Sequence, residues 1–133
     1  MTQSMQSRGV NERGTMTKDD ARKFAHAWIA AWNAHDLESI LAHYDDAVEL
    51  TSPVVVEVLG LPDGRLKGKQ NLRRYFQRGL EAHPSLHFHL QDVLCGLRSV
   101  VLYYDNQRGG RTAEFMEFSQ DGRVVRVVAN YSA

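Results

Sequence analysis

The hydrophobic pattern of the chain changes near His83-Pro84. Before that point apolar residues recur at spacings of three and four, and after it they alternate with polar residues. The first spacing places residues on one face of a helix, whereas alternation places them on one face of a strand. Because 133 residues are about the length of one domain, helices followed by antiparallel strands predict a single α+β unit.

The composition limits where in the cell the protein is expected and which classes of partner it is expected to bind. Sixteen basic and sixteen acidic side chains give a net charge of zero, which argues against nucleic acid or an anionic membrane as the main partner. No apolar run approaches the roughly 18 residues of a membrane span. Cys95 is the single cysteine, so no intrachain disulfide forms. Together with an N-terminus that lacks a signal-peptide core, this predicts a cytoplasmic protein.

Residues 1–16 are polar and show no periodicity. They predict a disordered or loosely docked tail before a domain at 17–133. Met16 is an alternative to Met1 as the first residue of the translated chain.

Three helices are predicted in the first part of the domain. Thr17 is expected to cap the first, and Asp36 the second, which should span Leu37–Tyr44. A third helix is predicted over Gln70–Ala82. The spacing of the apolar residues gives the first helix a buried face made of Ala21, Phe24, Ala25, Trp28, Ile29 and Trp32.

A first strand is predicted over Ala47–Thr51, ended or bent by Ser52-Pro53. The β-branched run at 54–59 fits either an extension of this strand or a loop at a pocket mouth. After Pro84, alternation and turn residues predict four more strands. They cover residues 86–95, Ser99–Asp105, Thr112–Ser119 and Val124–Tyr131.

The stretch from Trp28 to Pro53 brings several aromatic residues toward one apolar space. The end of the first helix, the second helix and the first strand would meet there, and the later elements would close around it. We therefore predict a hydrophobic pocket for a small molecule, with a ligand-binding wall formed by Trp28, Trp32, Tyr44, Leu50, Phe76 and Met116.

Glu114 is the leading candidate for chemistry. It shares a strand face with Met116 and Phe118, so it is a carboxyl among apolar neighbours, and burial would raise its pKa toward the range useful for an acid or a base. If the strand faces the other way, Glu114 is in solvent and Phe115 lies inside. Tyr104 and Tyr131 are either donors of phenolic hydrogen bonds into the pocket or packing residues.

The histidines and arginines give weaker signals. His87 and His89 share a strand face, but without an evident third ligand a polar outer or dimer-facing surface is the better interpretation, and we predict no metal and no cofactor. The other four histidines, His83 among them, are expected to be structural or exposed. Arg73, Arg74 and Arg78 are expected to form a solvated face of the third helix.

Several segments, in order, resemble a known family over residues 17–131. They are W-x3-W-N-A-H-D-L-E-S-I-L-A-H-Y-D-D, a strand ended by Pro53, G-K-x3-R-x-Y-F, and a D-G-R-V hairpin before A-N-Y. They are similar to the SnoaL-like branch of the nuclear transport factor 2-like superfamily. The resemblance implies a cone-shaped α+β barrel of three N-terminal helices on a strongly curved, mostly antiparallel sheet, with a pocket and a homodimer formed through the sheet.

Members of this superfamily include ketosteroid isomerase, polyketide cyclases, limonene epoxide hydrolase, scytalone dehydratase and non-catalytic domains. Against ketosteroid isomerase, Ser52 stands where that enzyme has its general base, Trp28 where it has a phenol donor, and Glu114 where it has a protonated carboxyl. A serine without a base does not take a proton from carbon, so steroid isomerisation is not expected.

Two functions remain open at this stage. The first is a cofactor-free acid–base enzyme of the cyclase, isomerase or dehydratase type acting on a hydrophobic ring-containing substrate. Glu114 would exchange the proton while Tyr104, Tyr131 or Ser52 orients an oxygen. The alternative is a non-catalytic ligand-binding or protein-association domain of the same fold.

Overall fold

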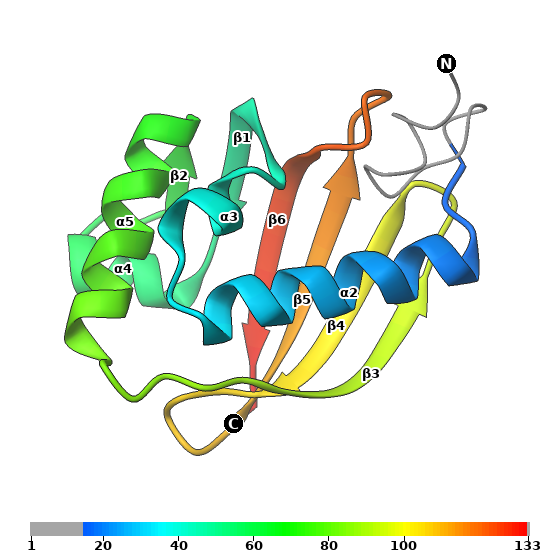
Figure 1. Ribbon diagram of the computed structural model, residues 1–133. Helices are drawn as coiled ribbons and strands as arrows, with labels where there is room; N and C mark the ends of the chain where they lie inside the picture. Colours follow the sequence, from blue (N-terminus) through cyan, green and yellow to red (C-terminus); the bar gives the residue numbers. More distant parts are fainter. Residues whose placement is uncertain (1–14, 133) are drawn as a thin grey trace.

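The structure is a computed structural model, and it describes residues 15–132. Helices and strands alternate in the first half and four strands follow in the second (Figure 1). The elements are α2 (Lys18–Asn33), α3 (Leu37–Leu41), β1 (Tyr44–Thr51), α4 (Pro53–Leu59), β2 (Arg65–Lys67), α5 (Lys69–Ala82), β3 (His89–Cys95), β4 (Ser99–Asp105), β5 (Arg111–Phe118) and β6 (Val124–Tyr131). The predicted α+β class is confirmed, with four helices rather than three in this part of the chain.

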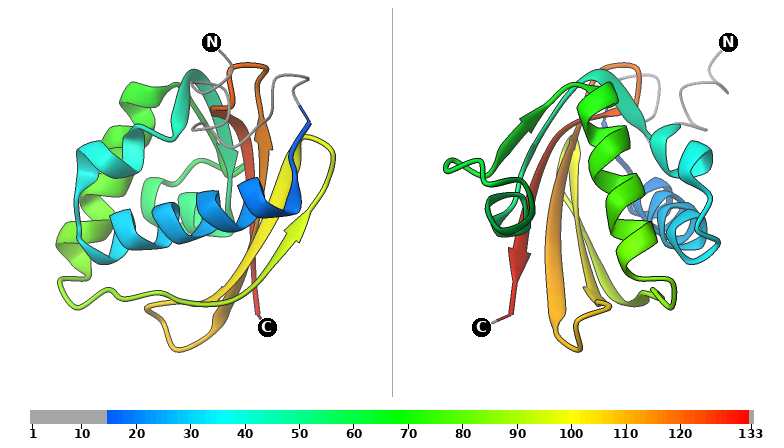
Figure 2. Two further views of the ribbon diagram at one scale, coloured as in Figure 1. Left: turned by 45° about the vertical axis from the view of Figure 1, so that its right-hand side comes forward. Right: turned by 90° about the vertical axis from the view of Figure 1, so that its left-hand side faces the viewer.

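The six strands form one sheet in the order β2-β1-β6-β5-β4-β3. Only β1 and β6 pair in parallel, and the other neighbours are antiparallel. The sheet is bent but not closed, because β2 and β3 remain at its two edges. Figure 2 shows α2, α3 and α5 on one side of the bent sheet, so the buried core lies between these helices and the strands.

Helix α2 forms as its sequence predicts. The Thr17 side chain accepts a hydrogen bond of 3.0 Å from the backbone N–H of Asp20, which satisfies one of the free donors at the helix start. The predicted apolar face is turned to the sheet, with Ala25 and Trp28 fully buried. Packing begins slightly before the predicted domain start, because Met16 is buried and donates its N–H to the Leu97 carbonyl at 2.7 Å. Residues 1–14 of the predicted tail lie outside the described residues.

Helix α3 is shorter than predicted. Asp36 caps it as expected, accepting from the Ser39 N–H at 3.2 Å, but the helix ends at Leu41 and Tyr44 already belongs to β1. The strand starts early because Val124 of β6 donates its N–H to the His43 carbonyl at 2.9 Å, and because Tyr44 is completely buried. Tertiary contacts therefore override the helical spacing at this point.

The segment after β1 is helix α4, which neither predicted alternative anticipated. Ser52 caps it by accepting from the Val54 N–H at 3.1 Å, and Pro53 occupies the first turn, where its missing N–H costs nothing. Gly60, with φ of 68°, ends the helix in the left-handed region. These start and stop residues outweigh the strand preference of the valines between them.

The later strands follow the predictions closely, and β4 and β6 have the predicted bounds. Strand β3 begins later than expected, at His89, although Leu86 and Phe88 before it are buried. On β5 the buried side chains alternate, so the face of Glu114 points to the helices. Glu114 lies opposite Leu102 on β4 and Ala129 on β6, in the middle of the sheet.

Candidate functional site: an aromatic pocket with a buried carboxyl

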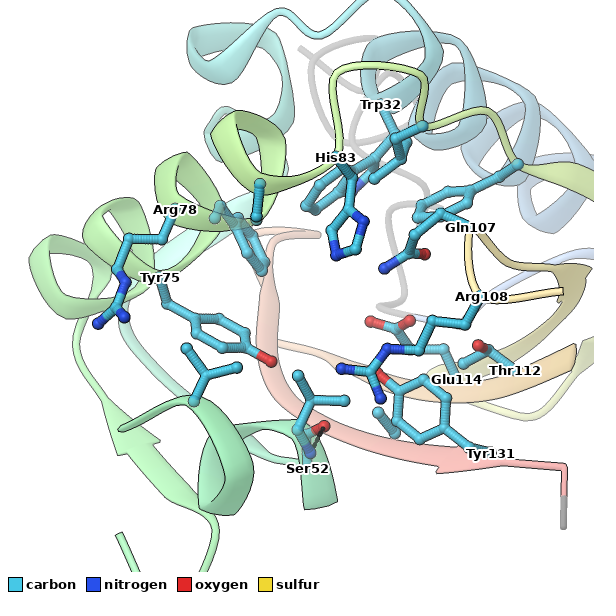
Figure 3. Close-up of a pocket in the computed structure, with 18 of the residues that line it drawn as sticks. Trp32, Ser52, Tyr75, Arg78, His83, Gln107, Arg108, Thr112, Glu114 and Tyr131 are labelled. Carbon is cyan, nitrogen blue, oxygen red and sulfur yellow. Dashed lines mark hydrogen bonds between the residues drawn. The ribbon is translucent and has the colours of Figure 1, made fainter. Parts of the chain in front are cut away.

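A pocket opens between the helices and the concave face of the sheet. Its cavity volume is about 190 Å³, and it is partly open to solvent. An engineered apolar cavity of about 150 Å³ holds benzene, so this volume suits one ring with a short substituent. The walls are formed by α2, β1, α4, α5, β4, β5, β6 and two connecting loops (Figure 3).

The apolar wall is a set of aromatic rings in mutual contact. Trp28 stacks on Phe88 with 5.9 Å between ring centroids, and Phe88 lies 4.6 Å from Tyr104 by the same measure. Asn33 fixes the backbone of Phe88, accepting from its N–H at 2.7 Å and donating to its carbonyl at 3.0 Å. Trp32 completes the wall, with its ring 4.8 Å from that of Phe76. Flat rings fixed in this way form a preorganised surface for a ring-shaped ligand.

Glu114 is the acidic residue of this pocket and is only 6% exposed. It accepts a hydrogen bond of 2.5 Å from the Tyr104 hydroxyl. No other hydrogen bond to Glu114 is found among residues 15–132, and its carboxyl points into the cavity (Figure 3). Burial raises the pKa of Glu114 from 4.5 to about 7, although the bond from Tyr104 acts in the opposite direction. The group therefore exchanges its proton close to neutral pH.

Tyr104 is hydrogen-bonded to the Glu114 carboxyl and belongs to a series of hydrogen-bonded polar side chains. Burial and the nearby Glu114 raise the pKa of Tyr104 well above its usual value, so the phenol remains a donor, while a hydrogen bond with Thr112 opposes this rise. Thr112 accepts from the Asn106 side chain at 3.0 Å. The Asn106 oxygen in turn accepts from the backbone of the hairpin between β4 and β5, including the Arg108 N–H at 2.9 Å. The buried carboxyl is thus connected to the hairpin at the pocket mouth.

A second polar group lies beside Glu114, and we call it the phenol–arginine cluster. It consists of Ser52, Tyr75, Tyr131 and Arg108, and all four line the pocket (Figure 3). Burial raises the pKa of both phenols, whereas hydrogen bonds with Ser52 and the charge of Arg108 act to lower it. Arg108 also forms an ion pair of 3.1 Å with Glu57 of α4.

His83 and Gln107 approach the cavity from two different loops. Figure 3 shows the His83 ring and the Gln107 amide at the pocket mouth, near each other and on the side of Trp32. Neither was predicted to lie in the site, because an isolated residue in a loop carries no periodic signal.

Most of the residues predicted from sequence do line the pocket. They are Trp28, Trp32, Leu50, Ser52, Phe76, Tyr104, Glu114 and Tyr131. Tyr44 and Met116 do not, and this part of the prediction needs correction. Both lie in the solid core, and the Tyr44 oxygen is occupied by a hydrogen bond of 2.9 Å from the Trp28 indole N–H. The alternation of residues shows which face is inside but not whether a side chain reaches the cavity.

The histidine pair behaves as an exposed surface. His87 and His89 are exposed, with 4.7 Å between ring centroids. Within residues 15–132 no three His, Cys, Asp or Glu side chains are grouped in a way that would hold a metal ion. In the same part of the chain, no helix has the length and apolar character to cross a bilayer.

The family model of the SnoaL-like domain matches residues 25–127, which include the whole aromatic wall and Glu114. The chain belongs to the SnoaL-like family. A solved SnoaL-like protein of unknown function from Burkholderia thailandensis is 40% identical, with a TM-score of 0.87 over 90% of this chain and 99% of that one. No curated protein matches this SnoaL-like chain.

More distant structures share the fold alone. A protein provisionally assigned as a ketosteroid isomerase, from Kribbella flavida, is 19% identical with a TM-score of 0.65, over 85% of this chain and 78% of that one. A protein provisionally assigned as a hydroxylase, from Streptomyces galilaeus, is 18% identical with a TM-score of 0.67, over 87% and 91%. These likenesses confirm the fold but do not select a reaction.

Proposed function

We propose that this SnoaL-like protein binds a small ring-containing molecule in the aromatic pocket and exchanges a proton with it through Glu114, without a cofactor. The observation that carries this proposal is the state of the carboxyl. One oxygen is fixed by Tyr104, the group points into the cavity, and its pKa is near 7. A general acid or base works best when its pKa lies near the operating pH.

The expected chemistry is acid–base catalysis of the isomerase, cyclase or dehydratase kind. Glu114 as a carboxylate would take a proton from a carbon next to a carbonyl group, and as an acid it would return the proton elsewhere. Ser52 and Tyr131, which both line the pocket, would orient the carbonyl oxygen. The Ser52 oxygen accepts from the Val54 N–H, and its hydroxyl, which forms hydrogen bonds with Tyr75 and Tyr131, would turn to the carbonyl oxygen when a ligand binds.

The comparison with ketosteroid isomerase supports a different use of the same fold. Ser52, at the position of that enzyme's base, caps helix α4. The Trp28 indole, at the position of the phenol donor, gives its N–H to Tyr44. Glu114 is the one of the three positions that keeps an ionisable group facing the cavity, so it would have to supply the base itself. The cavity of about 190 Å³ also favours one ring over a four-ring steroid.

The alternative is a non-catalytic ligand-binding or protein-association domain. Its support is the outer face of the sheet, where Tyr103 and Phe115 are partly exposed and would suit a homodimer formed through the sheet. Size-exclusion chromatography with light scattering tests this dimer, and a monomer at micromolar concentration would contradict it. A cytoplasmic location remains a prediction that fractionation of cells tests.

Proton exchange is tested with small cyclic ketones in deuterium oxide, by following the loss of the α-proton signal in NMR spectra. The wild-type protein should accelerate exchange of a fitting ketone, and Glu114→Gln should lower the rate at least 100-fold, as expected for loss of a general base. Glu117→Gln, on the opposite face of the same strand, is the matched control and should keep the rate. Full exchange by Glu114→Gln would remove the mechanism, and tight binding without exchange would favour the non-catalytic alternative.

A further inference from the structure

The phenol–arginine cluster has a composition that the proposed proton exchange does not require. It contains three hydroxyl groups and a guanidinium, brought together from the end of β1, from α5, from β6 and from the hairpin between β4 and β5. The substrate oxygen in such an exchange needs only one or two hydrogen-bond donors. Four donor side chains at one end of a small apolar pocket indicate a ligand group with several acceptor lone pairs.

The electrical character of the cluster is positive. Its two phenols are protonated at neutral pH, because burial raises the pKa of both, so they donate hydrogen bonds without adding negative charge. The Arg108 guanidinium is permanently charged and has five N–H donors. Its Nη1 atom contacts Glu57 at 3.1 Å, and that carboxylate is more than half exposed, so the pair orients the guanidinium while water screens the opposing charge.

We propose that the phenol–arginine cluster binds the carboxylate of a single-ring carboxylic acid whose ring lies against the aromatic wall. This rests on the proposed function, since it takes the pocket to hold a ring. A carboxylate offers two oxygens and about four lone-pair sites, which matches the number of donor side chains in the cluster. A guanidinium binds a carboxylate through parallel hydrogen bonds, and a charge-assisted bond of this kind is about twice as strong as a neutral one.

A bound carboxylate would also act on Glu114, because the two acids would share one small cavity. Like charges at close range cannot both be ionised without cost, so binding should favour the protonated form of Glu114. The other titratable or charged groups that face Glu114 are Tyr44 of β1, Tyr75 of α5, Tyr104 of β4, Tyr131 of β6, and Arg108 and His83 at the mouth. The phenols stay neutral near pH 7, so Glu114 is the group whose protonation the bound carboxylate would change.

Binding of the ligand carboxylate should therefore be accompanied by uptake of a proton. The affinity should decrease as the pH rises through about 7. Below that pH Glu114 is protonated and carries no charge, and its O–H group can donate a hydrogen bond to the ligand. Above it, a proton must be added for each ligand bound, so the dissociation constant should rise by up to tenfold per pH unit.

The test compares benzoate with benzamide, its neutral analogue of nearly equal size, by isothermal titration calorimetry at pH 6 and pH 8.5. Benzoate should bind at least tenfold more tightly than benzamide at pH 6, and its affinity should fall at pH 8.5. Arg108→Gln should abolish this preference, because it should weaken the binding of benzoate much more than that of benzamide. Arg74→Gln is the matched control: it also removes one arginine charge, but from α5 and outside the pocket, so it should keep the preference for benzoate. Circular dichroism melts of both variants establish that they fold.

Glu114→Gln separates the two proposals. It should still bind benzoate but lose the pH dependence of the affinity, and a variant that keeps the pH dependence overturns the linkage to Glu114. Equal affinities of the wild type for benzoate and benzamide overturn the carboxylate site while leaving the ring pocket standing. Failure of both ligands to bind overturns both proposals. Preference for benzoate without any proton exchange supports the carboxylate site and contradicts catalysis.

Discussion

Burial of an ionisable carboxyl makes the stability of this fold depend on pH. The pKa of Glu114 is about 7 in the folded protein and near 4.5 in the unfolded chain. Since the folded value is the higher one, the folded state holds the proton more tightly. The contribution to stability is complete below pH 4.5 and is lost as the pH rises to 7. This difference in pKa corresponds to about 3 kcal/mol of unfolding free energy.

Glu114→Gln tests this magnitude, because the amide keeps the shape of the side chain and does not ionise. The unfolding free energy of the variant minus that of the wild type should rise by about 3 kcal/mol between pH 4.5 and pH 8. Urea denaturation followed by tryptophan fluorescence measures it, since Trp28 and Trp32 are both buried in the folded state. The change with pH is the quantity compared, because constant effects of the amide cancel in it.

The matched control is Glu117→Gln. Glu117 lies on the same strand but on its outer face, where its carboxylate forms a 3.0 Å ion pair with Arg126 in solvent. This variant should show no rise between the two pH values. If Glu114→Gln also shows a constant difference from the wild type, the carboxyl does not titrate near neutrality, and both its role in proton exchange and its linkage to ligand binding are refuted.

Two further predictions concern the supports of the pocket. Trp28→Phe removes the donor that satisfies the buried Tyr44 oxygen, so it should lower the unfolding free energy by about 2–3 kcal/mol in urea denaturation, and a loss below 1 kcal/mol would contradict this hydrogen bond. Gly64→Ala should cost clearly more than Gly60→Ala, because both glycines have positive φ but only at Gly64 would the new Cβ lie 2.8 Å from the Ser52 carbonyl oxygen. Equal losses in thermal melts of these two variants would show that this close approach does not limit the turn.

The sequence predicted most of the fold because local and global preferences agree over most of the chain. The alternation of apolar and polar residues gives the bounds of β4 and β6, and the sequence pattern alone identifies Thr17 as a helix cap. The failures are at places where two signals compete. At 53–59 the valines favour a strand, whereas Ser52-Pro53 and Gly60 favour a helix, and the caps prevail. At Tyr44 the pairing with β6 replaces the last turn of a predicted helix.

The site was predictable only in part, for a related reason. Glu114 could be assigned to the inner face of its strand, because the alternation of residues along a strand shows which of them share a face. Tyr75 is recognisable as part of an apolar helix stripe, but the stripe does not reveal that its hydroxyl forms a hydrogen bond with Ser52 and interacts electrostatically with Tyr131. Arg108 lies in a hairpin loop, where no periodicity applies. Which side chains from separate helices, strands and loops come together depends on the tertiary structure. Patterns in a single sequence contain little information about it.

The parallel pairing of β1 with β6 has a consequence for how the protein is made. Tyr44 pairs with Val124, so β1 and its neighbour β6, which is one of the two central strands, lie far apart in the sequence. During translation the helices and β1 are synthesised long before β6, with which β1 pairs. The loop that this pairing closes is long. Ala129 and Tyr131 of β6 are also pocket walls. The newly synthesised chain therefore has no complete binding cavity until its final strand has inserted, and a ligand can stabilise only molecules that have passed that step.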